Sequence, residues 1–203
     1  GRAILAAGCS FPELQEAEYW REEGARRLLD DMQVQVMPDG ASYELTPGYQ
    51  MAIASWFLDA YKIARKFDRQ LDPDLEAGIR RMYDWCVSIN RPDFSHPSVS
   101  DAGSTDSRYR DSLAGPGRLL GNEAAVWVGT QGAEGQMPDY TSVARQDSGY
   151  FMMRSGWDKD ARYLHFEGGP FGRFHQHEDM LSLDVYAYGT PFIVDPGITS
   201  YYP

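Results

Sequence analysis

The chain has 203 residues, 42% hydrophobic and 24% charged, which is typical of a globular protein with one large or two small domains. The net charge of −11 argues against a general nucleic-acid binder, because such affinity comes mainly from phosphate neutralisation. A locally basic cleft can still bind an anion. No apolar stretch approaches the roughly 20 residues of a membrane-spanning helix. The two cysteines, Cys9 and Cys86, lack a CxxC spacing, and we expect buried thiols.

Apolar residues recur with a helical period in the first part of the chain. This spacing predicts helices over residues 14–36, 51–64, 75–89 and, as a shorter one, 122–128. Pro12 is expected in the first turn of the first helix, and Asp72 is expected to cap the third, with Pro73 at its first position. The segments 37–49 and 91–117 are polar and interrupted by turn residues, which predicts two loops that can line a site.

After residue 138 the period changes to two and β-forming residues dominate. The pattern predicts strands over residues 149–154, 162–166, 181–188 and 192–194, with turns at Ser155-Gly156 and Gly189-Thr190. Strands that follow one another without intervening helices indicate an antiparallel sheet or sandwich. The sequence therefore predicts a multidomain α + β protein with a helical domain over 1–137 and a β domain over 138–203.

The densest group of titratable residues precedes the third predicted strand. The segment Phe174-His175-Gln176-His177-Glu178-Asp179 places two of the four histidines two residues apart, on one face of an extended chain. With Asp195 they form a plausible zinc ligand set, although in a flat hairpin His177 would lie about 20 Å from Asp195, so the chain must bend. A metal site, a catalytic or substrate-contacting histidine, and a structural hydrogen bond remain open alternatives. Asp195-Pro196-Gly197 also has the composition of a simple turn.

The first predicted loop carries Tyr43, Glu44 and Tyr49. A tyrosine can act as acid or base where neighbouring cations lower its phenolic pKa, but most loop tyrosines pack or face solvent. His165 alternates with apolar residues and is expected within a sheet. Trp157 is suited to stacking on a sugar ring, yet core packing is the favoured interpretation.

Two segments of the chain resemble the heparinase II/III superfamily of polysaccharide lyases, which includes the oligoalginate lyases. The pattern Pro38-Asp39-Gly40-x-x-Tyr43-Glu44-x-Thr46-Pro47-x-Tyr49 is similar to an inter-helix loop of that family. Its β-domain signature is similar to His175-x-His177-x-Asp179 followed by Leu181-Ser182, Tyr186-x-x-Gly189 and Asp195-Pro196-Gly197. The resemblance implies a partial (α/α) toroid of helical hairpins followed by the start of an antiparallel β-sandwich.

The same resemblance implies a reaction and a set of residues. The reaction is β-elimination at a uronic acid, which requires a neutralised carboxylate, a base for the C5 proton and an acid for the leaving O4. Tyr49 matches the catalytic tyrosine of the family, with Tyr43 as the fallback, and His175 matches a catalytic or substrate-contacting histidine. Tyr43, Glu44 and Arg173 are expected to bind an anionic polysaccharide or oligosaccharide.

His177 and Asp195 match positions that hold a structural Zn²⁺ in several members of the superfamily. The third zinc ligand, and an upstream Asn or His, are expected outside this chain, which alone is therefore expected to be inactive. Two alternatives are a non-catalytic carbohydrate-binding protein of the same fold and a zinc-dependent hydrolase. The resemblance also implies a periplasmic or secreted protein, whereas the sequence predicts no particular oligomeric state.

Overall fold

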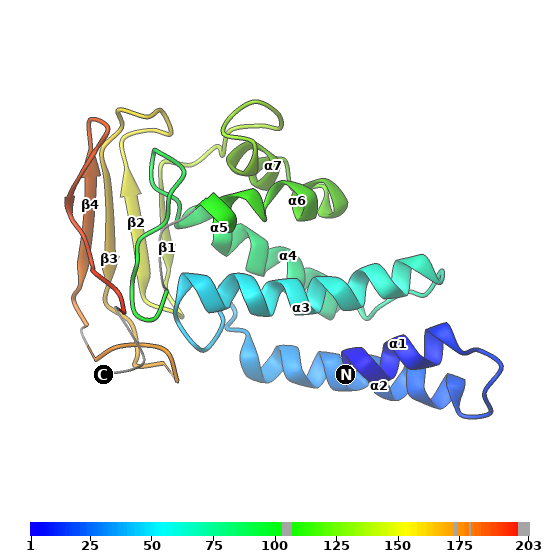
Figure 1. The fold of residues 1–203 in the computed structure, drawn as a ribbon. Coiled ribbons are helices and arrows are strands. Elements are labelled where there is room, and N and C mark those ends of the chain that lie inside the picture. Colours follow the sequence, from blue (N-terminus) through cyan, green and yellow to red (C-terminus); the bar gives the residue numbers. More distant parts are fainter. Residues whose placement is uncertain (103–106, 173, 179, 199–203) are drawn as a thin grey trace.

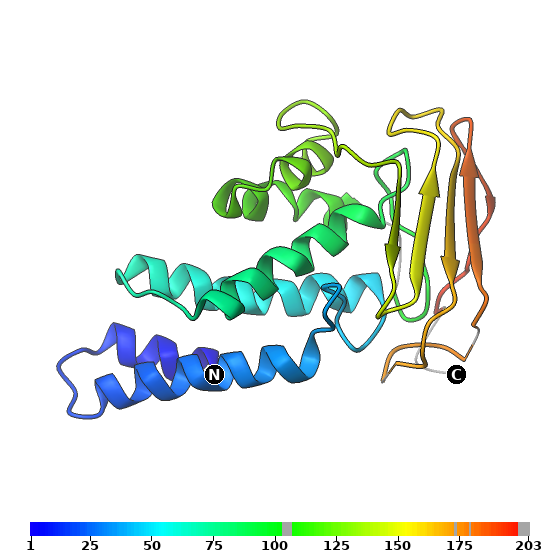
Figure 2. The same ribbon diagram turned by 180° about the vertical axis from the view of Figure 1, so that it is seen from behind.

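The computed structural model describes residues 1–102, 107–172, 174–178 and 180–198. Helices occupy the first part and a sheet stands across one end of them (Figures 1 and 2). The helices are α1 (Arg2–Ser10), α2 (Ala17–Gln35), α3 (Pro47–Lys66), α4 (Pro73–Ser88), α5 (Ser107–Asp111), α6 (Ala114–Leu120) and α7 (Glu123–Gly129). The strands are β1 (Ser142–Arg145), β2 (Tyr150–Arg154), β3 (Tyr163–Glu167), β4 (Leu183–Ala187) and β5 (Thr190–Ile193).

The first hairpin was predicted only in part. Helix α1 was missed because its nine residues are mostly small and give only a short apolar pattern. Helix α2 begins at Ala17, so the prediction of a start near Pro12 was wrong; Pro12 lies in the turn between the helices. The two helices pack closely, since a Cβ added to Gly24 would lie 2.5 Å from the backbone nitrogen of Leu5. Glycine is needed at this contact.

Helices α3 and α4 form a second hairpin that packs on the first and supplies much of the core. Asp72 caps α4 as predicted, because its side chain accepts a hydrogen bond from the backbone nitrogen of Asp74 at 2.9 Å. Helix α3 begins at Pro47, four residues earlier than its apolar pattern suggested. Both cysteines are buried thiols, as predicted.

The segment 91–117 contains more regular structure than expected. Helix α5 and the start of α6 lie in it, and the glycines and proline of α6 concealed its helical character. Helix α6 ends at Leu120 and is capped by Gly121, whose φ of 67° is the left-handed conformation that glycine adopts without strain. Asn122 then caps α7 by accepting a hydrogen bond from the backbone nitrogen of Ala125 at 2.9 Å.

The five strands form one antiparallel sheet in the order β1-β2-β3-β4-β5, so each strand pairs with its neighbour in sequence. Four of them lie within two residues of their predicted positions. Strand β1 was not predicted, because it has only four residues, few of them are apolar, and it lies at the edge of the sheet. The predicted boundary near residue 138 falls between the last helix and this strand.

The face of the sheet that meets the helices carries polar side chains that bind helix carbonyls. Arg154 Nη2 donates to the carbonyl of Ser88, and the Tyr163 hydroxyl donates to that of Ile89, at 2.7 and 2.9 Å. The last carbonyls of a helix lack partners within it and carry the negative end of its dipole. Arg154 is buried against the ring of Trp157, 3.5 Å from its centroid, which confirms the packing role of that tryptophan.

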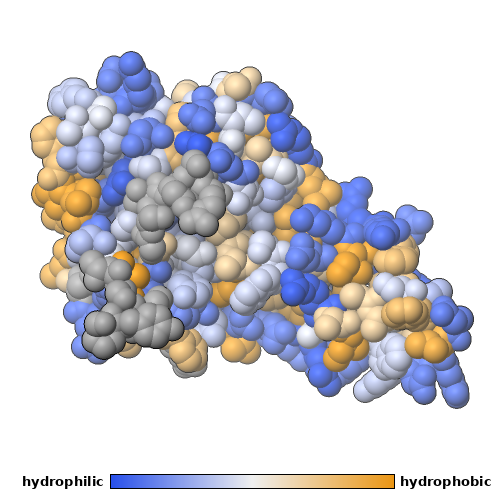
Figure 3. Space-filling view, in the orientation of Figure 1, coloured by the Kyte–Doolittle hydropathy of each residue, from blue (hydrophilic) through white to orange (hydrophobic). Residues whose placement is uncertain are grey.

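The opposite face of the sheet is apolar and partly exposed. Its hydrophobic side chains include Phe151, Met153, Phe166, Leu183 and Ile193. Figure 3 shows orange side chains along the edge of the molecule where Figure 1 places β4. This composition is that of the inward face of a sandwich, on which a second sheet packs. In the described part of the chain, none of the helices has the length and apolarity to span a membrane.

Candidate functional site

The predicted inter-helix loop and the histidine segment meet at the N-terminus of α3. The segment that follows β3 passes below the sheet to reach this point (Figure 1). The imidazole of His175 stacks on the phenol ring of Tyr49, with centroids 3.6 Å apart and planes inclined by 13°. The structure therefore brings together the two residues for which the family resemblance implied catalytic roles.

Glu44 binds the same histidine. Its Oε2 lies 2.6 Å from Nδ1 of His175, and both side chains are mostly buried. A carboxylate only accepts hydrogen bonds, so Nδ1 carries a proton and donates it. In the neutral imidazole the lone pair is then on Nε2, and we find no hydrogen bond to this atom from the described residues. The expected substrate-binding residue Glu44 thus contacts His175 directly.

Tyr43 lies beside the histidine segment but contacts the neighbour of His175. Its ring meets the edge of Phe174, with centroids 6.0 Å apart and planes at 79°. Phe174 is 77% exposed and has a φ of 68°, a left-handed conformation that is uncommon for a residue other than glycine. The chain approaches the loop closely here, because a Cβ on Gly172 would lie 2.9 Å from the Tyr43 carbonyl oxygen. Arg173, the predicted sugar-binding arginine, lies outside the described residues.

Gln176 anchors the histidine segment from the inside. It is buried, its Oε1 accepts a hydrogen bond from the backbone nitrogen of Gly172, and its Nε2 donates to Oε1 of Glu167 at 2.6 Å. Sequence reasoning did not select Gln176. Its position between two site-facing histidines in an extended segment was the available signal, since alternate side chains point to opposite faces.

Asp101 links the two histidines, and sequence reasoning missed it as well. Its Oδ1 lies 2.8 Å from Nε2 of His177, and its backbone nitrogen donates to the His175 carbonyl at 3.0 Å. Ser100 adds a hydrogen bond from the backbone nitrogen of His177 to its hydroxyl, at 3.2 Å. Asp101 belongs to a polar loop expected to line a site, but no local pattern distinguished it from other acidic residues.

The predicted zinc ligands approach this loop from two sides. The turn containing Asp195 packs on it, because a Cβ on Gly197 would lie 2.7 Å from the carbonyl oxygen of Ser98. Asp195 is buried, and its Oδ1 accepts a hydrogen bond from the backbone nitrogen of Gly197 at 2.7 Å. Strand β4 begins only at Leu183, so the preceding segment that carries His177 is not part of a flat hairpin.

The donor atoms of this pair suit zinc. With Nε2–H directed to Asp101, His177 keeps a lone pair on Nδ1, and Asp195 supplies carboxylate oxygens. Across the ranges that the structure describes, no group of three His, Cys, Asp or Glu side chains is arranged to hold a metal. His177 and Asp195 alone are fewer than the three or four protein ligands that a zinc site uses.

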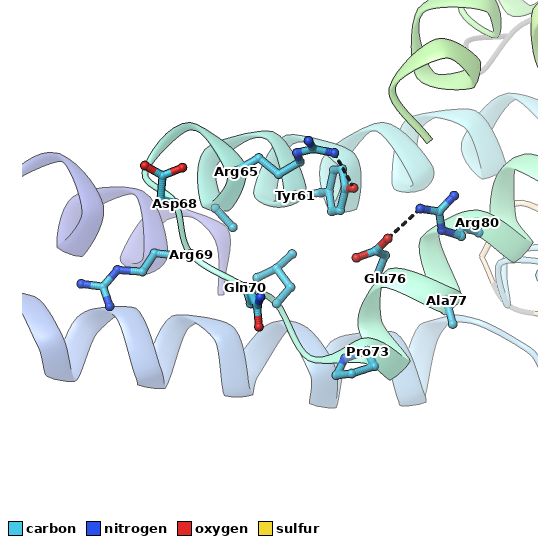
Figure 4. A pocket seen from close by; sticks show the side chains of 11 residues that line it. Tyr61, Arg65, Asp68, Arg69, Gln70, Pro73, Glu76, Ala77 and Arg80 are labelled. Carbon is cyan, nitrogen blue, oxygen red and sulfur yellow. Dashed lines mark hydrogen bonds and ion pairs between the residues drawn. The ribbon is translucent and has the colours of Figure 1, made fainter. Parts of the chain in front are cut away.

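A cavity of about 870 Å³ lies far from these residues, where α3 leads into α4 (Figure 4). Several of its charged groups are already bonded: Arg65 donates to the Tyr61 hydroxyl at 3.2 Å, and Arg80 pairs with Glu76 at 2.7 Å. Arg65 and Tyr49 lie near opposite ends of α3, about 24 Å apart at 1.5 Å per residue. This cavity is not part of the candidate site.

Both parts of the chain match known protein families. The family model described as heparinase II/III N-terminus matches residues 1–117, and the one described as heparinase II/III-like, C-terminal matches residues 137–203. A heparin-sulfate lyase of Pedobacter heparinus is 31% identical over 201 residues, which is 97% of this chain and 30% of that protein. A heparin-sulfate lyase of Bacteroides stercoris is 30% identical over 201 residues, 96% of this chain and 30% of the relative.

Solved structures agree with these matches. The crystal structure of heparan sulfate lyase HepC from Pedobacter heparinus matches with a TM-score of 0.93 and 30% identity, over 100% of this chain and 32% of that one. This match confirms the predicted fold class, a partial helical toroid followed by the start of a β-sandwich. The chain spans about a third of the length of these relatives. Since the matched models cover both its helical part and its sheet, the chain belongs to the heparinase II/III family.

Proposed function

We propose that the protein carrying this chain is a polysaccharide lyase that cleaves a uronic-acid-containing polysaccharide by β-elimination. The stack of His175 on Tyr49 supports this most directly, because it places two groups able to move protons side by side at the N-terminus of α3. The relatives named heparin-sulfate lyases make a heparan-sulfate-type glycosaminoglycan the first substrate to test.

The proposed reaction assigns proton transfers to this pair. The C5 proton of the uronate passes to a base, the C4–O4 bond breaks, a C4=C5 double bond forms, and O4 takes a proton. Tyr49 acts as acid and base on these atoms, and the Nε2 lone pair of His175 accepts a proton or hydrogen bond from the sugar beside it. Such groups are effective only when they lie within hydrogen-bond reach of the atoms that react.

The test is an assay of the full-length protein with heparan sulfate, heparin and alginate. β-Elimination creates an unsaturated uronate that absorbs ultraviolet light, whereas hydrolysis does not. We expect Tyr49→Phe to lower kcat by about 10²–10⁴-fold, because it removes the ionisable hydroxyl and retains the ring. If none of the three substrates yields an unsaturated product, the lyase proposal is wrong, and measurable binding would instead favour a non-catalytic carbohydrate-binding protein.

We further propose that His177 Nδ1 and Asp195 bind a structural Zn²⁺ together with a ligand from elsewhere in the protein. The types of donor atom and the shared packing on residues 98–101 support this proposal. When bound, the ion would supply a cross-link within the β domain. A periplasmic or extracellular location is also proposed, because large polysaccharides are usually met there, and cell fractionation would test it.

A further inference from the structure

We propose that Glu44 is a positioning residue that fixes the ring orientation and tautomer of His175, rather than a residue that binds the sugar. Its effect on catalysis rests on the proposed lyase function. The hydrogen bond itself is independent of that function, because it joins the side chains of Glu44 and His175, 2.6 Å apart, whatever reaction the protein performs.

Stacking alone leaves the imidazole ambiguous. Contact with the Tyr49 ring fixes the plane of the His175 ring, but a 180° rotation about the bond to the ring preserves that plane and moves both nitrogens. The backbone of His175 is held by the hydrogen bond from Asp101, which does not select between these two orientations either. Among the contacts that the ring of His175 makes with the described residues, that of Nδ1 with Glu44 is the directional one, so it selects one orientation and one tautomer.

Glu44 is itself held in place by its neighbours in the loop. Leu45 is 1% exposed, and its φ of 48° is a left-handed conformation that costs a leucine free energy. Its carbonyl accepts a hydrogen bond from the hydroxyl of Tyr150 in the sheet, at 2.6 Å. On the other side, the backbone nitrogen of Tyr43 donates to the carbonyl of Gln35. The loop is therefore fixed at both neighbours of Glu44.

The charge of the expected substrate supports this assignment. A uronate is an anion, and a second carboxylate within a few ångströms repels it, more strongly where water is excluded. A carboxylate that accepts the Nδ1–H of an imidazole instead gains a charge-assisted hydrogen bond if the ring becomes protonated. Glu44 is thus suited to bind His175 and poorly suited to bind the sugar.

Kinetics of the full-length protein separate the possible roles of Glu44. If it positions His175, Glu44→Ala should lower kcat by about 10–100-fold with KM changed less than about threefold, as for loss of other residues that orient a functional histidine. Glu44→Gln should recover part of the loss, because its amide oxygen still accepts from Nδ1–H. A rise in KM at constant kcat would overturn the proposal in favour of sugar binding.

The tautomer is measured independently of activity. In ¹⁵N-histidine-labelled full-length protein, the nitrogen chemical shifts of His175, assigned with a His175→Asn variant, should show the proton on Nδ1. Glu44→Ala should give a mixture of tautomers or the reverse tautomer, whereas the exposed control Glu22→Ala in α2 should leave the spectrum and kcat unchanged. An unchanged His175 tautomer in Glu44→Ala contradicts the proposal. A protein without lyase activity that shows the expected tautomer shift would refute only the proposed function.

Discussion

His175 and His177 are two residues apart, yet each is held by a different carboxylate. Glu44 comes from the loop before α3, and Asp101 comes from the loop after α4. In both pairs one ring nitrogen donates to a carboxylate and the other keeps a lone pair in the neutral ring. The two histidines are therefore oriented separately, as the two proposed roles in sugar contact and zinc binding require.

The hydrogen bond between Asp101 and His177 leads us to predict that Asp101 strengthens zinc binding. A histidine that binds zinc usually donates its other ring N–H to a carboxylate, and removal of that carboxylate costs about 10–100-fold in affinity. We expect Asp101→Ala to weaken zinc binding by this factor, measured by competition with a chelator. The exposed Asp147→Ala is the matched control. Equal zinc affinity in the Asp101 variant and the parent would show that this hydrogen bond does not support a metal site.

Strand β3 carries a third histidine, His165, at the interface between the sheet and the helices. His165 is fully buried, no hydrogen bond to either ring nitrogen is found among the described residues, and its ring lies against that of Tyr150. Burial, followed by the positive charge of Arg91, lowers its pKa to about 3. Asp184, its partner across the sheet, is already paired with Arg91. His165 therefore stays neutral in the folded protein over most of the acidic range.

This pKa makes stability depend on pH. Between about pH 6.5 and 3, the unfolded chain binds a proton at His165 that the folded chain does not, so stability falls as the pH decreases through that window. The contribution is at most about 1.4 kcal/mol per pH unit. A His165→Leu variant should lose less stability than the parent between pH 7 and pH 4.5, as measured by the denaturant midpoint. Identical pH dependence would mean that other groups control acid unfolding.

At the scale of the whole molecule, the apolar core continues from the helices into the sheet, and buried polar groups cross the same contact. Arg91 and Asp184 form a buried ion pair across this contact, with Nε and Oδ1 2.7 Å apart. Such a pair fixes relative orientation, because separation would leave a buried charge without its partner. This helps to hold the start of α3, which carries Tyr49, in place relative to the segment that carries His175.

Metal removal from the full-length protein distinguishes the two possible roles of zinc. A structural ion should, on chelation, lower the melting temperature, since it binds the folded state preferentially. Readdition of Zn²⁺ should restore the original value. Loss of activity at an unchanged melting temperature would instead favour a zinc-dependent hydrolase, and no change in either property would show that His177 and Asp195 bind no functional metal.

The sequence by itself determined the local features of this chain. Helical and strand periods located three of the longer helices and four strands, and capping by Asp72 followed from residue type. Helix α1 and strand β1 were not predicted, because such short elements carry too few apolar residues to show a period. The motif resemblance also selected Tyr49 and His175 as functional residues before any contact between them was known.

Only the tertiary structure decided which side chains meet. Glu44 and His175 are separated by 131 positions, and Asp101 and His177 by 76, so no local pattern relates either pair. Their contacts exist because the sheet packs across the helix ends and brings the loops together at the N-terminus of α3. Propensity and periodicity act over a few residues, whereas the direction of a hydrogen bond at the site depends on how whole elements pack.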